Sequence, residues 1–230
     1  MVHLLSAPPD AAAIRAAWQS LTEGIDQATA AVHRPAGAVT LVAVSKNHPV
    51  ATIEPLVQAG HRIFGENRVQ EATEKWYELK QRTPDIQLHC IGPLQRNKVR
   101  EAVAIFDVIE TLDRPQLAVA LSAEMQRQGR FLPCMVQVNI GQEPQKAGVA
   151  PDQTTDLVAH ARDLGLKVTG LMCIPPVDHS PEPYFTRLRD LAHHAHVADL
   201  SMGMSADYAT AIHYGATHVR IGSALFGARS

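Results

Sequence analysis

The chain has 230 residues, 46% of them hydrophobic, and a formal net charge of −2 at pH 7. This length suits one α/β barrel with a substantial core, and the charge excludes the basic excess expected of proteins that bind nucleic acid or anionic membranes. No apolar run could span a bilayer, and residues 1–10 lack the features of a signal peptide, so we expect a cytoplasmic protein with a single domain over residues 1–230.

The first predicted element is a helix over residues 14–32. Its apolar residues recur at spacings of three and four, which places them on one face, and Asp10 can cap its start. Residues 39–45 are apolar and rich in β-branched side chains, which predicts a buried strand. Pro49 then opens a short helix, and Gly60 lies just past its end.

This strand–helix unit recurs along the chain. Further strands are predicted near residues 62–65, 88–91, 108–110, 135–139, 168–173, 200–202 and 219–221. Among the helices between them, the one over residues 114–128 is the best defined: Asp113 can cap it, Pro115 lies in its first turn and Gly129 ends it. Eight such units predict parallel strands in an α/β (β/α)8 TIM barrel with an extra N-terminal helix. A doubly wound open sheet is the alternative fold.

A lysine, Lys46, directly follows the first predicted strand. In a barrel, the carboxyl ends of the strands form the active face. Burial lowers the pKa of a lysine and makes its amine nucleophilic toward an aldehyde. The alternative is a lysine that extends from the strand end into solvent, so this feature alone does not establish a site.

Small residues follow the last two predicted strands. Residues 201–205 (SMGMS) precede a helix with Asp207 in its first turn, and residues 220–224 (RIGSA) follow the eighth strand. Backbone N–H groups at two neighbouring helix starts favour an anion, and barrels often bind phosphate at this place. Arg220 could pair with that phosphate or with the ring of a phosphate-bearing ligand. Ordinary helix caps are the alternative.

Polar residues also follow other predicted strands, and their convergence favours a ligand pocket. They are Glu66, Asn67, Asn97, Lys98, Asn139 and Lys146. We predict no metal site, because no His or Cys pair with ligand spacing lies at a strand end. The cluster of His193, His194 and His196 is expected on an exposed helix face, and the three cysteines (Cys90, Cys134 and Cys173) as buried, reduced thiols.

Taken together, these segments resemble the pyridoxal phosphate homeostasis proteins, also called the YggS/PROSC family, over residues 39–229. The matching segments are residues 41–46 (LVAVSK), 64–67 (FGEN) with 69–71 (VQE), 89–92 (HCIG) with 94–95 (LQ) and 97–98 (NK), 138–139 (VN) with Glu143, Lys146 and Gly148, 170–172 (GLM) with 174–175 (IP), 200–205 (LSMGMS) with Asp207, and 219–223 (VRIGS) with 226–227 (FG).

The resemblance implies a barrel of the alanine racemase N-terminal type that binds pyridoxal 5′-phosphate (PLP). Lys46 takes the position of the lysine that forms a Schiff base with PLP, and Lys146 matches a second lysine implicated in PLP handling. The remaining cofactor-binding positions that it implies are Ser201, Ser205, Gly222 and Ser223 for the phosphate, Arg220 for the pyridine nitrogen, and Asn67 and Met204 for the pocket lining. His48 stands where many relatives have a lysine, which weakens the case for PLP hand-off through that position.

The predicted function is that of a PLP-binding regulator or carrier in vitamin B6 and amino-acid/keto-acid balance. We expect a monomer with PLP-dependent apo-enzymes as candidate recipients. Strong catalysis is not expected, because Arg220 would disfavour protonation of the pyridine nitrogen and because the chain ends at Ser230, without the β domain that supplies a tyrosine in alanine racemase. The alternatives are an amino-acid racemase, with Lys46 serving one face and Lys146, His48 or Tyr208 the other, and a phosphate-sugar isomerase barrel without PLP.

Overall fold

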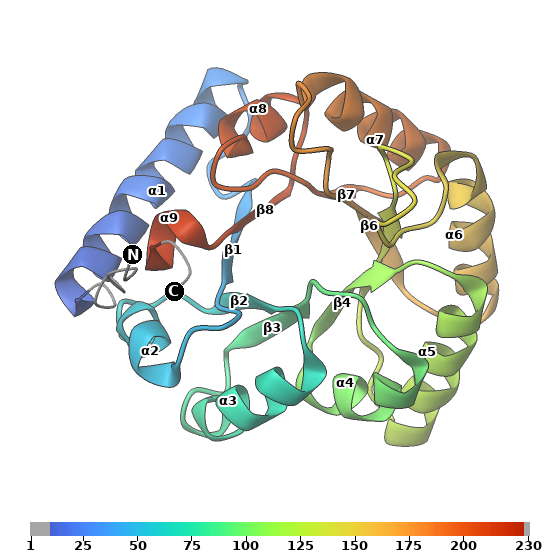
Figure 1. Cartoon of the computed structure of the whole chain (residues 1–230), viewed down its shortest axis with the longest axis horizontal. Coiled ribbons are helices and arrows are strands. Elements are labelled where there is room, and N and C mark those ends of the chain that lie inside the picture. The colour runs from blue at the N-terminus through green and yellow to red at the C-terminus, as the bar shows by residue number, and fades with distance from the viewer. Residues whose placement is uncertain (1–9, 228–230) are drawn as a thin grey trace, which may run out of the picture.

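The computed structural model of the chain describes residues 10–227, in which eight parallel strands form a closed barrel (Figure 1). Neighbouring strands follow the chain order, and β8 pairs with β1. The strands are β1 (Thr40–Val44), β2 (Ile63–Glu66), β3 (Gln87–Cys90), β4 (Val108–Leu112), β5 (Cys134–Val138), β6 (Val168–Cys173), β7 (Asp199–Ser201) and β8 (His218–Ile221). The predicted (β/α)8 barrel is therefore confirmed, and the open doubly wound alternative is wrong.

Helices surround the barrel as an outer layer (Figure 1). They are α1 (Ala11–Ala31), α2 (Val50–Gln58), α3 (Val69–Arg82), α4 (Val99–Ile105), α5 (Pro115–Gln128), α6 (Thr154–Asp163), α7 (Glu182–His194), α8 (Tyr208–His213) and α9 (Ser223–Phe226), with short 3₁₀ turns at Arg96–Lys98 and Pro151–Gln153. The extra N-terminal helix, α1, packs against α2, α8 and α9. It thus covers the outside of the barrel where the first and last strands meet.

Local signals in the sequence account for most helix ends. The Asp10 carboxylate accepts the N–H of Ala13 at 2.7 Å and caps α1, as predicted. Gly129 ends α5 in the left-handed region, with φ 64°, where glycine carries no steric penalty. The predicted cap of α5 by Asp113 is wrong. Arg114 occupies the residue before the helix, and Asp113 pairs with the Arg114 guanidinium instead.

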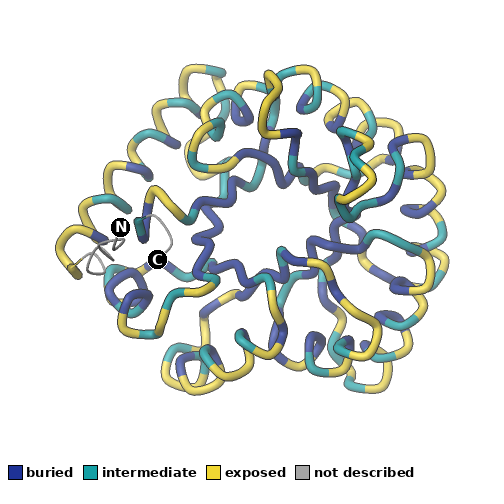
Figure 2. The backbone as a smooth tube through the Cα atoms, in the orientation of Figure 1, coloured by how far each residue is buried: buried dark blue, intermediate teal, exposed yellow. Residues whose placement is uncertain are grey.

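The core has two layers, which follow from the alternation of side chains along each strand. Outward-facing residues such as Leu41, Ala43 and Phe64 pack against the helices, and the buried segments in Figure 2 trace this layer around the whole barrel. Inward-facing residues fill the interior, and several of them are polar: His89, Glu110, Gln137, Ser201 and Arg220 are all buried. Buried polar groups in the interior of a barrel indicate a ligand-binding site at one of its ends.

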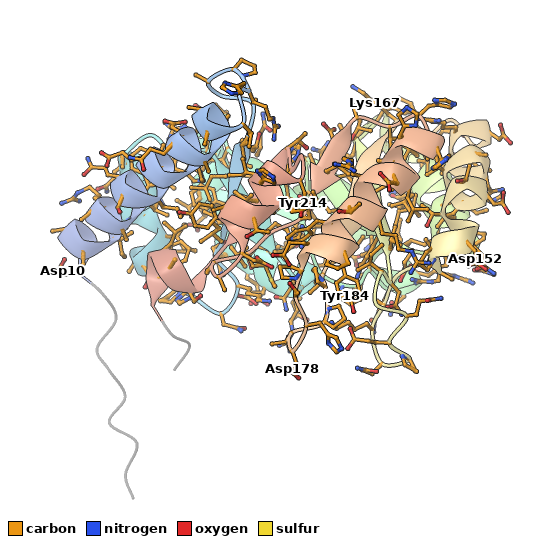
Figure 3. All side chains as sticks on the ribbon, turned by 90° about the horizontal axis from the view of Figure 1, so that it is seen from above. Asp10, Asp152, Lys167, Asp178, Tyr184 and Tyr214 are labelled. Atoms are coloured by element: carbon orange, nitrogen blue, oxygen red, sulfur yellow. The ribbon has the colours of Figure 1, made fainter. Side chains whose placement is uncertain are left out.

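The two ends of the barrel are separated in the side view of Figure 3. Lys167, just before β6, lies at one end, and Asp178, in the loop after β6, lies at the other. The loops that follow the strands therefore share one face with Asp178. No helix within residues 10–227 is both long and apolar enough to cross a membrane. The prediction that residues 1–10 are not a signal peptide falls almost wholly on residues 1–9, which lie outside the described residues, as does the chain end at Ser230.

Two residues of α5, one buried and one exposed, provide a matched test of which face of the helix packs against the barrel. Leu121 is completely buried, whereas Val119 on the same helix is 50% exposed. Leu121→Ala should lower the free energy of unfolding by about 2–5 kcal/mol, because it leaves a cavity in the core. Val119→Ala should change it by no more than about 0.5 kcal/mol. Urea denaturation measures both, and equal effects would contradict the orientation of α5.

Candidate functional site

The pairing of β1 with β8 places the first and last strands of the barrel side by side. Val42 pairs with Arg220 and Ala43 with Ile221, so both strands end at the same level of the barrel mouth. A cavity of 290 Å³ opens there, and we call it the Lys46 cavity. Among its lining residues are Lys46, Met204, Ser205, Arg220, Gly222 and Ser223, all of which the sequence predicted as cofactor-binding.

Helix α3 holds the backbone on both sides of Lys46. The ammonium of Lys75 donates to the Ser45 carbonyl oxygen at 2.8 Å, and the Asn47 N–H donates to Glu71 Oε1 at 2.6 Å. Lys75 and Glu71 are themselves an ion pair at 2.7 Å, one helical turn apart. Asn47 adopts φ 63°, which these contacts hold in place. The peptide that carries Lys46 is therefore fixed by a partly buried charge pair.

Sequence reasoning did not assign Lys75. The spacing of Glu71 and Lys75 signals a salt bridge on a helix, but it does not show which loop the pair would contact. That contact depends on how α3 packs against the end of β1.

Glu66 belongs to the same cluster and does not enter the ligand pocket. Its Oε1 accepts from Ser45 Oγ at 2.7 Å, from Lys75 at 2.9 Å and from the Trp76 indole at 3.0 Å, all between the barrel and α3. Burial raises the pKa of Glu66, although the charge of Lys75 and these hydrogen bonds oppose the shift. The expected convergence of Glu66 with the pocket residues is wrong, because alternate strand residues face opposite sides of the barrel wall.

Two serine hydroxyls face each other across the loops after β7 and β8. Ser223 Oγ donates to Ser205 Oγ at 3.0 Å, and the Ala224 N–H donates to the same Ser205 oxygen at 3.4 Å. Within residues 10–227, the N–H groups of Ser205 and Ala206 donate to no backbone or side-chain acceptor. Hydroxyls and unpaired N–H groups that converge in this way can bind an anion. The helices that follow are only 6 and 4 residues long, so the individual donors matter more than a helix dipole.

We call the Ser205 and Ser223 hydroxyls and the neighbouring backbone N–H groups the anion cradle. The backbone around it is held in place by Asp207 and Gly203. The Asp207 carboxylate accepts the Met204 N–H at 2.6 Å and fixes the loop, and Asp207 immediately precedes α8 instead of lying in its first turn. Gly203 adopts φ 94°, and a Cβ atom there would lie 2.5 Å from the Ala211 Cβ. A larger residue at position 203 would therefore push the loop away from α8.

Arg220 is held at the base of the Lys46 cavity by buried partners. Its guanidinium donates to Ser201 Oγ at 2.6 Å and to the Cys173 carbonyl oxygen at 2.8 Å. The Ser201 hydroxyl in turn donates to Glu110 Oε2 at 2.6 Å, and His89 Nδ1 lies 2.6 Å from Glu110 Oε1. The structure thus places Ser201 below the cavity beside Arg220, away from the cradle of Ser205 and Ser223.

Glu110 is the negative charge that balances Arg220 inside the barrel. Burial alone would raise its pKa, but the hydrogen bond and charge of His89, the charge of Arg220 and the Ser201 hydroxyl outweigh burial and lower the pKa to about 2. Glu110 was not singled out from the sequence. Its position in β4 looks like any strand interior, and only the closed barrel brings it to Ser201 and His89.

The other predicted residues line neighbouring cavities at the same mouth. Asn67 borders one with Arg68 and Lys98, Lys146 borders one above β5, and His48 borders a small space beside Lys46 and Ser223. The ring of His48 also stacks on Phe226, with centroids 5.0 Å apart. Asn97 lies in the turn before α4.

Several residues lie away from the mouth. A Cβ built on Gly24 of α1 would lie 2.6 Å from the Tyr208 hydroxyl, so this hydroxyl points at α1 and away from the cavity. His193, His194 and His196 are exposed, as expected, but only His193 and His194 lie on a helix, because α7 ends at His194. Cys90, Cys134 and Cys173 are buried thiols, also as expected, and burial raises the pKa of each.

Removal of the buried Glu110 charge should change how the free energy of unfolding depends on pH. Because the pKa of Glu110 lies below its ordinary value of 4.5, its carboxylate stabilises the native state above about pH 4.5, and this contribution is lost as the pH falls toward about 2. Glu110→Gln should cost on the order of 3 kcal/mol at pH 7, because it leaves Arg220 without its counter-charge.

The difference from wild type should then shrink between pH 4.5 and 2, as followed by urea denaturation. Glu78→Gln, at an exposed position of α3, is the control. A difference for Glu110→Gln that does not change with pH would contradict the assignment.

Comparisons with known proteins agree with this geometry. Residues 13–230 match the family described as alanine racemase, N-terminal domain. The chain is 40% identical over 220 residues to the pyridoxal phosphate homeostasis protein of Pasteurella multocida strain Pm70, which covers 91% of this chain and 94% of that protein.

Solved structures show the same fold. PipY of Synechococcus elongatus PCC7942 without PLP is 37% identical, has a TM-score of 0.79 and covers 88% of this chain and 100% of PipY; a second PipY structure, with PLP bound, is 38% identical with a TM-score of 0.74. Alanine racemase of Clostridium difficile 630 shares the fold at 14% identity, with a TM-score of 0.74 over 98% of this chain and 60% of the racemase. The chain therefore belongs to the pyridoxal phosphate homeostasis protein family, with the barrel fold of the alanine racemase N-terminal domain.

Proposed function

We propose that this protein, as a single barrel domain, binds PLP as a Schiff base on Lys46 and holds it as a carrier in PLP homeostasis. The observation that carries the proposal is that an amine and an anion cradle line one cavity. Lys46 and the Ser205–Ser223 hydroxyl pair both border the Lys46 cavity. The PipY structure with PLP bound, from a relative of the same family, supports it.

The residues present fit each part of PLP. The Ser205 and Ser223 hydroxyls, with the N–H groups beside them, would hold the phosphate, and Val44 and Ile174 offer apolar walls to the ring. Gly222 lets the end of β8 lie close to β1 at the cavity edge, because a Cβ there would lie 3.0 Å from the Val44 carbonyl oxygen. A volume of 290 Å³ is near the lower limit of small-molecule sites, which run from roughly 300 to 1,000 Å³.

Arg220 supports a carrier more than an enzyme. PLP supplies, when bound, an aldehyde for amines and a ring that withdraws electrons best when its nitrogen is protonated. The Arg220 guanidinium is always charged, and Ser201 and the Cys173 carbonyl hold it at the cavity base. A fixed cation beside the ring nitrogen would disfavour its protonation.

Of the three candidates for the second base of a racemase, Tyr208 is the one that the structure directs away from the Lys46 cavity. Tyr208, one of the candidates, directs its hydroxyl at Gly24 of α1 and away from the cavity. No observation favours the isomerase alternative over PLP binding. Transfer of PLP to apo-enzymes and a monomeric state are further predictions of the carrier proposal.

The Schiff base on Lys46 can be trapped directly. PLP is added to the protein, borohydride reduces the product, and peptide mass spectrometry locates the pyridoxyl adduct. We expect the adduct on Lys46, its loss in Lys46→Arg, and its retention in Lys146→Arg. An adduct spread evenly over surface lysines, or absent from Lys46, would refute the proposal.

The anion cradle is tested by comparing PLP with pyridoxal, which lacks the phosphate. Ser223→Ala should weaken PLP binding about tenfold, because a hydrogen bond to a charged group is lost, and should leave pyridoxal binding unchanged. The measurement is an absorbance titration with each compound. Ser180→Ala, in the exposed loop after β6, is the control. An equal loss for PLP and pyridoxal would show that Ser223 does not contact the phosphate.

A further inference from the structure

A second cavity lies next to the Lys46 cavity at the barrel mouth. It has a volume of 250 Å³, lies over the end of β5 and is bordered by Gln137 and Lys146, and we call it the β5 cavity. Ile91 and Ile174 line both cavities, so the two spaces are direct neighbours. The proposed carrier function assigns no ligand to the β5 cavity.

Gln137 presents an unsatisfied acceptor to this cavity. Its side chain points into the barrel from β5, and the residue is only 7% exposed. The Nε2 group donates to the Ala147 carbonyl oxygen at 3.1 Å, which fixes the orientation of the amide. In the part of the chain that the structure describes, the buried Oε1 has no partner. A buried acceptor without a donor is costly, so a donor from a bound molecule is expected here.

Lys146 offers a positive group to the same space. Its ammonium contacts Glu143 Oε2 at 2.5 Å and the Pro175 carbonyl oxygen at 3.1 Å. The contact with Pro175 is a hydrogen bond, whereas the contact with Glu143 is an ion pair in which, among the described residues, Oε2 accepts no hydrogen bond. An ammonium carries three N–H donors, so donors remain for a ligand carboxylate. Because Glu143 already balances the charge of Lys146, the site as a whole suits a ligand without net charge.

Asn139 shapes the loop and has little capacity left for a ligand. Its amide nitrogen donates to the carbonyl oxygens of Glu143 at 2.8 Å and Lys146 at 3.3 Å, and its Oδ1 accepts the Glu143 N–H at 3.0 Å. These bonds hold the backbone of Lys146 over the cavity. Asn139 is therefore a positioning residue for Lys146.

The remaining side-chain walls are aliphatic and the space is small. Ile91, Pro93 and Ile174 contribute apolar surface. A volume of 250 Å³ is below the usual range of small-molecule sites, roughly 300–1,000 Å³, but it exceeds the share of one water molecule, about 30 Å³, several times. A small ligand with an aliphatic side chain fits these walls.

We propose that the β5 cavity binds a small aliphatic α-amino acid. Its carboxylate would contact Lys146, its ammonium would donate to Gln137 Oε1, and its side chain would lie against Ile91 and Ile174. A zwitterion matches the neutral Lys146–Glu143 pair, whereas a carboxylic acid without an amine would leave Gln137 unsatisfied. This site needs no PLP, and it lies beside the cavity in which PLP is proposed to bind.

The test uses the whole chain with isotope-labelled isoleucine methyl groups, in the wild type and in Lys46→Ala. L-valine is titrated in, and methyl NMR spectra are recorded without added PLP. We expect saturable shifts at Ile91 and Ile174 in both proteins, and none at Ile53, which is buried in the outer layer. Lys46→Ala cannot form the Schiff base, so this result is independent of the borohydride experiment.

Ligands and variants then separate the contacts. Isovalerate is L-valine without the ammonium, and isobutylamine is L-valine without the carboxylate, so each should bind about tenfold more weakly than L-valine or worse. Gln137→Met should weaken L-valine binding by a similar factor, whereas Gln126→Met, on the exposed face of α5, should not change it. Lys146→Met tests the contact with the ligand carboxylate and should also weaken L-valine binding. The dispersion of the methyl signals shows whether each variant is folded.

Three outcomes would overturn the proposal. The first is the absence of saturable shifts at Ile91 and Ile174 up to millimolar L-valine, which would mean that the cavity holds water only. The second is isovalerate binding as well as L-valine, which would mean that Gln137 receives no donor from the ligand. The third is unchanged L-valine binding in folded Gln137→Met and Lys146→Met proteins.

Discussion

The pairing of β1 with β8 is the constraint on which the rest of the molecule depends. Lys46 and Ser223 are separated by most of the chain, yet the register of Val42 with Arg220 and Ala43 with Ile221 places both at one mouth. A β8 shifted by one residue would turn Arg220 out of the interior, because alternate residues face opposite sides of the wall. Helix α1 packs over this junction from outside, so the extra N-terminal helix supports the closure that creates the site.

The charges inside the barrel show how a polar site is kept in a buried setting. Arg220 is 5% exposed, and Ser201, Glu110 and His89 give it a continuous set of partners. Between the barrel wall and α3, the Lys75 ammonium forms ion pairs with Glu66 and Glu71 and donates to the Ser45 carbonyl oxygen. One network fixes the cation at the base of the Lys46 cavity and the other fixes the backbone of Lys46 itself. Orientation at this site is thus set by paired charges, which lose much of their contribution when one partner is removed.

Much of this arrangement could be predicted from the sequence. Strand and helix periodicities gave the order of the elements and the barrel, and Lys46, Ser205 and Ser223 were assigned because small or nucleophilic residues directly followed apolar strands. Errors arose where a neighbour in space decided the outcome. Asp113 pairs with Arg114 instead of capping α5, and Glu66 faces α3. The role of Ser201 toward PLP stays a prediction, and its hydrogen bond to Glu110 is a contact that the sequence did not indicate. The sequence did not indicate Gln137 as a site residue, because nothing in a strand sequence shows that one amide oxygen will lack a hydrogen-bond partner.

The sequence by itself determined the succession of strands and helices, the residues at the strand ends and the resemblance to a PLP-binding family, because these depend on local periodicity and on matching segments. Only the tertiary structure decided which of those residues meet. The closed barrel divides the mouth into the Lys46 cavity and the β5 cavity, separated by Ile91 and Ile174, and gives Arg220 its buried counter-charge in Glu110. The physical reason is that hydrogen bonds and charge pairing act over a few ångströms, and residues distant in the chain come within that range only when β8 closes on β1.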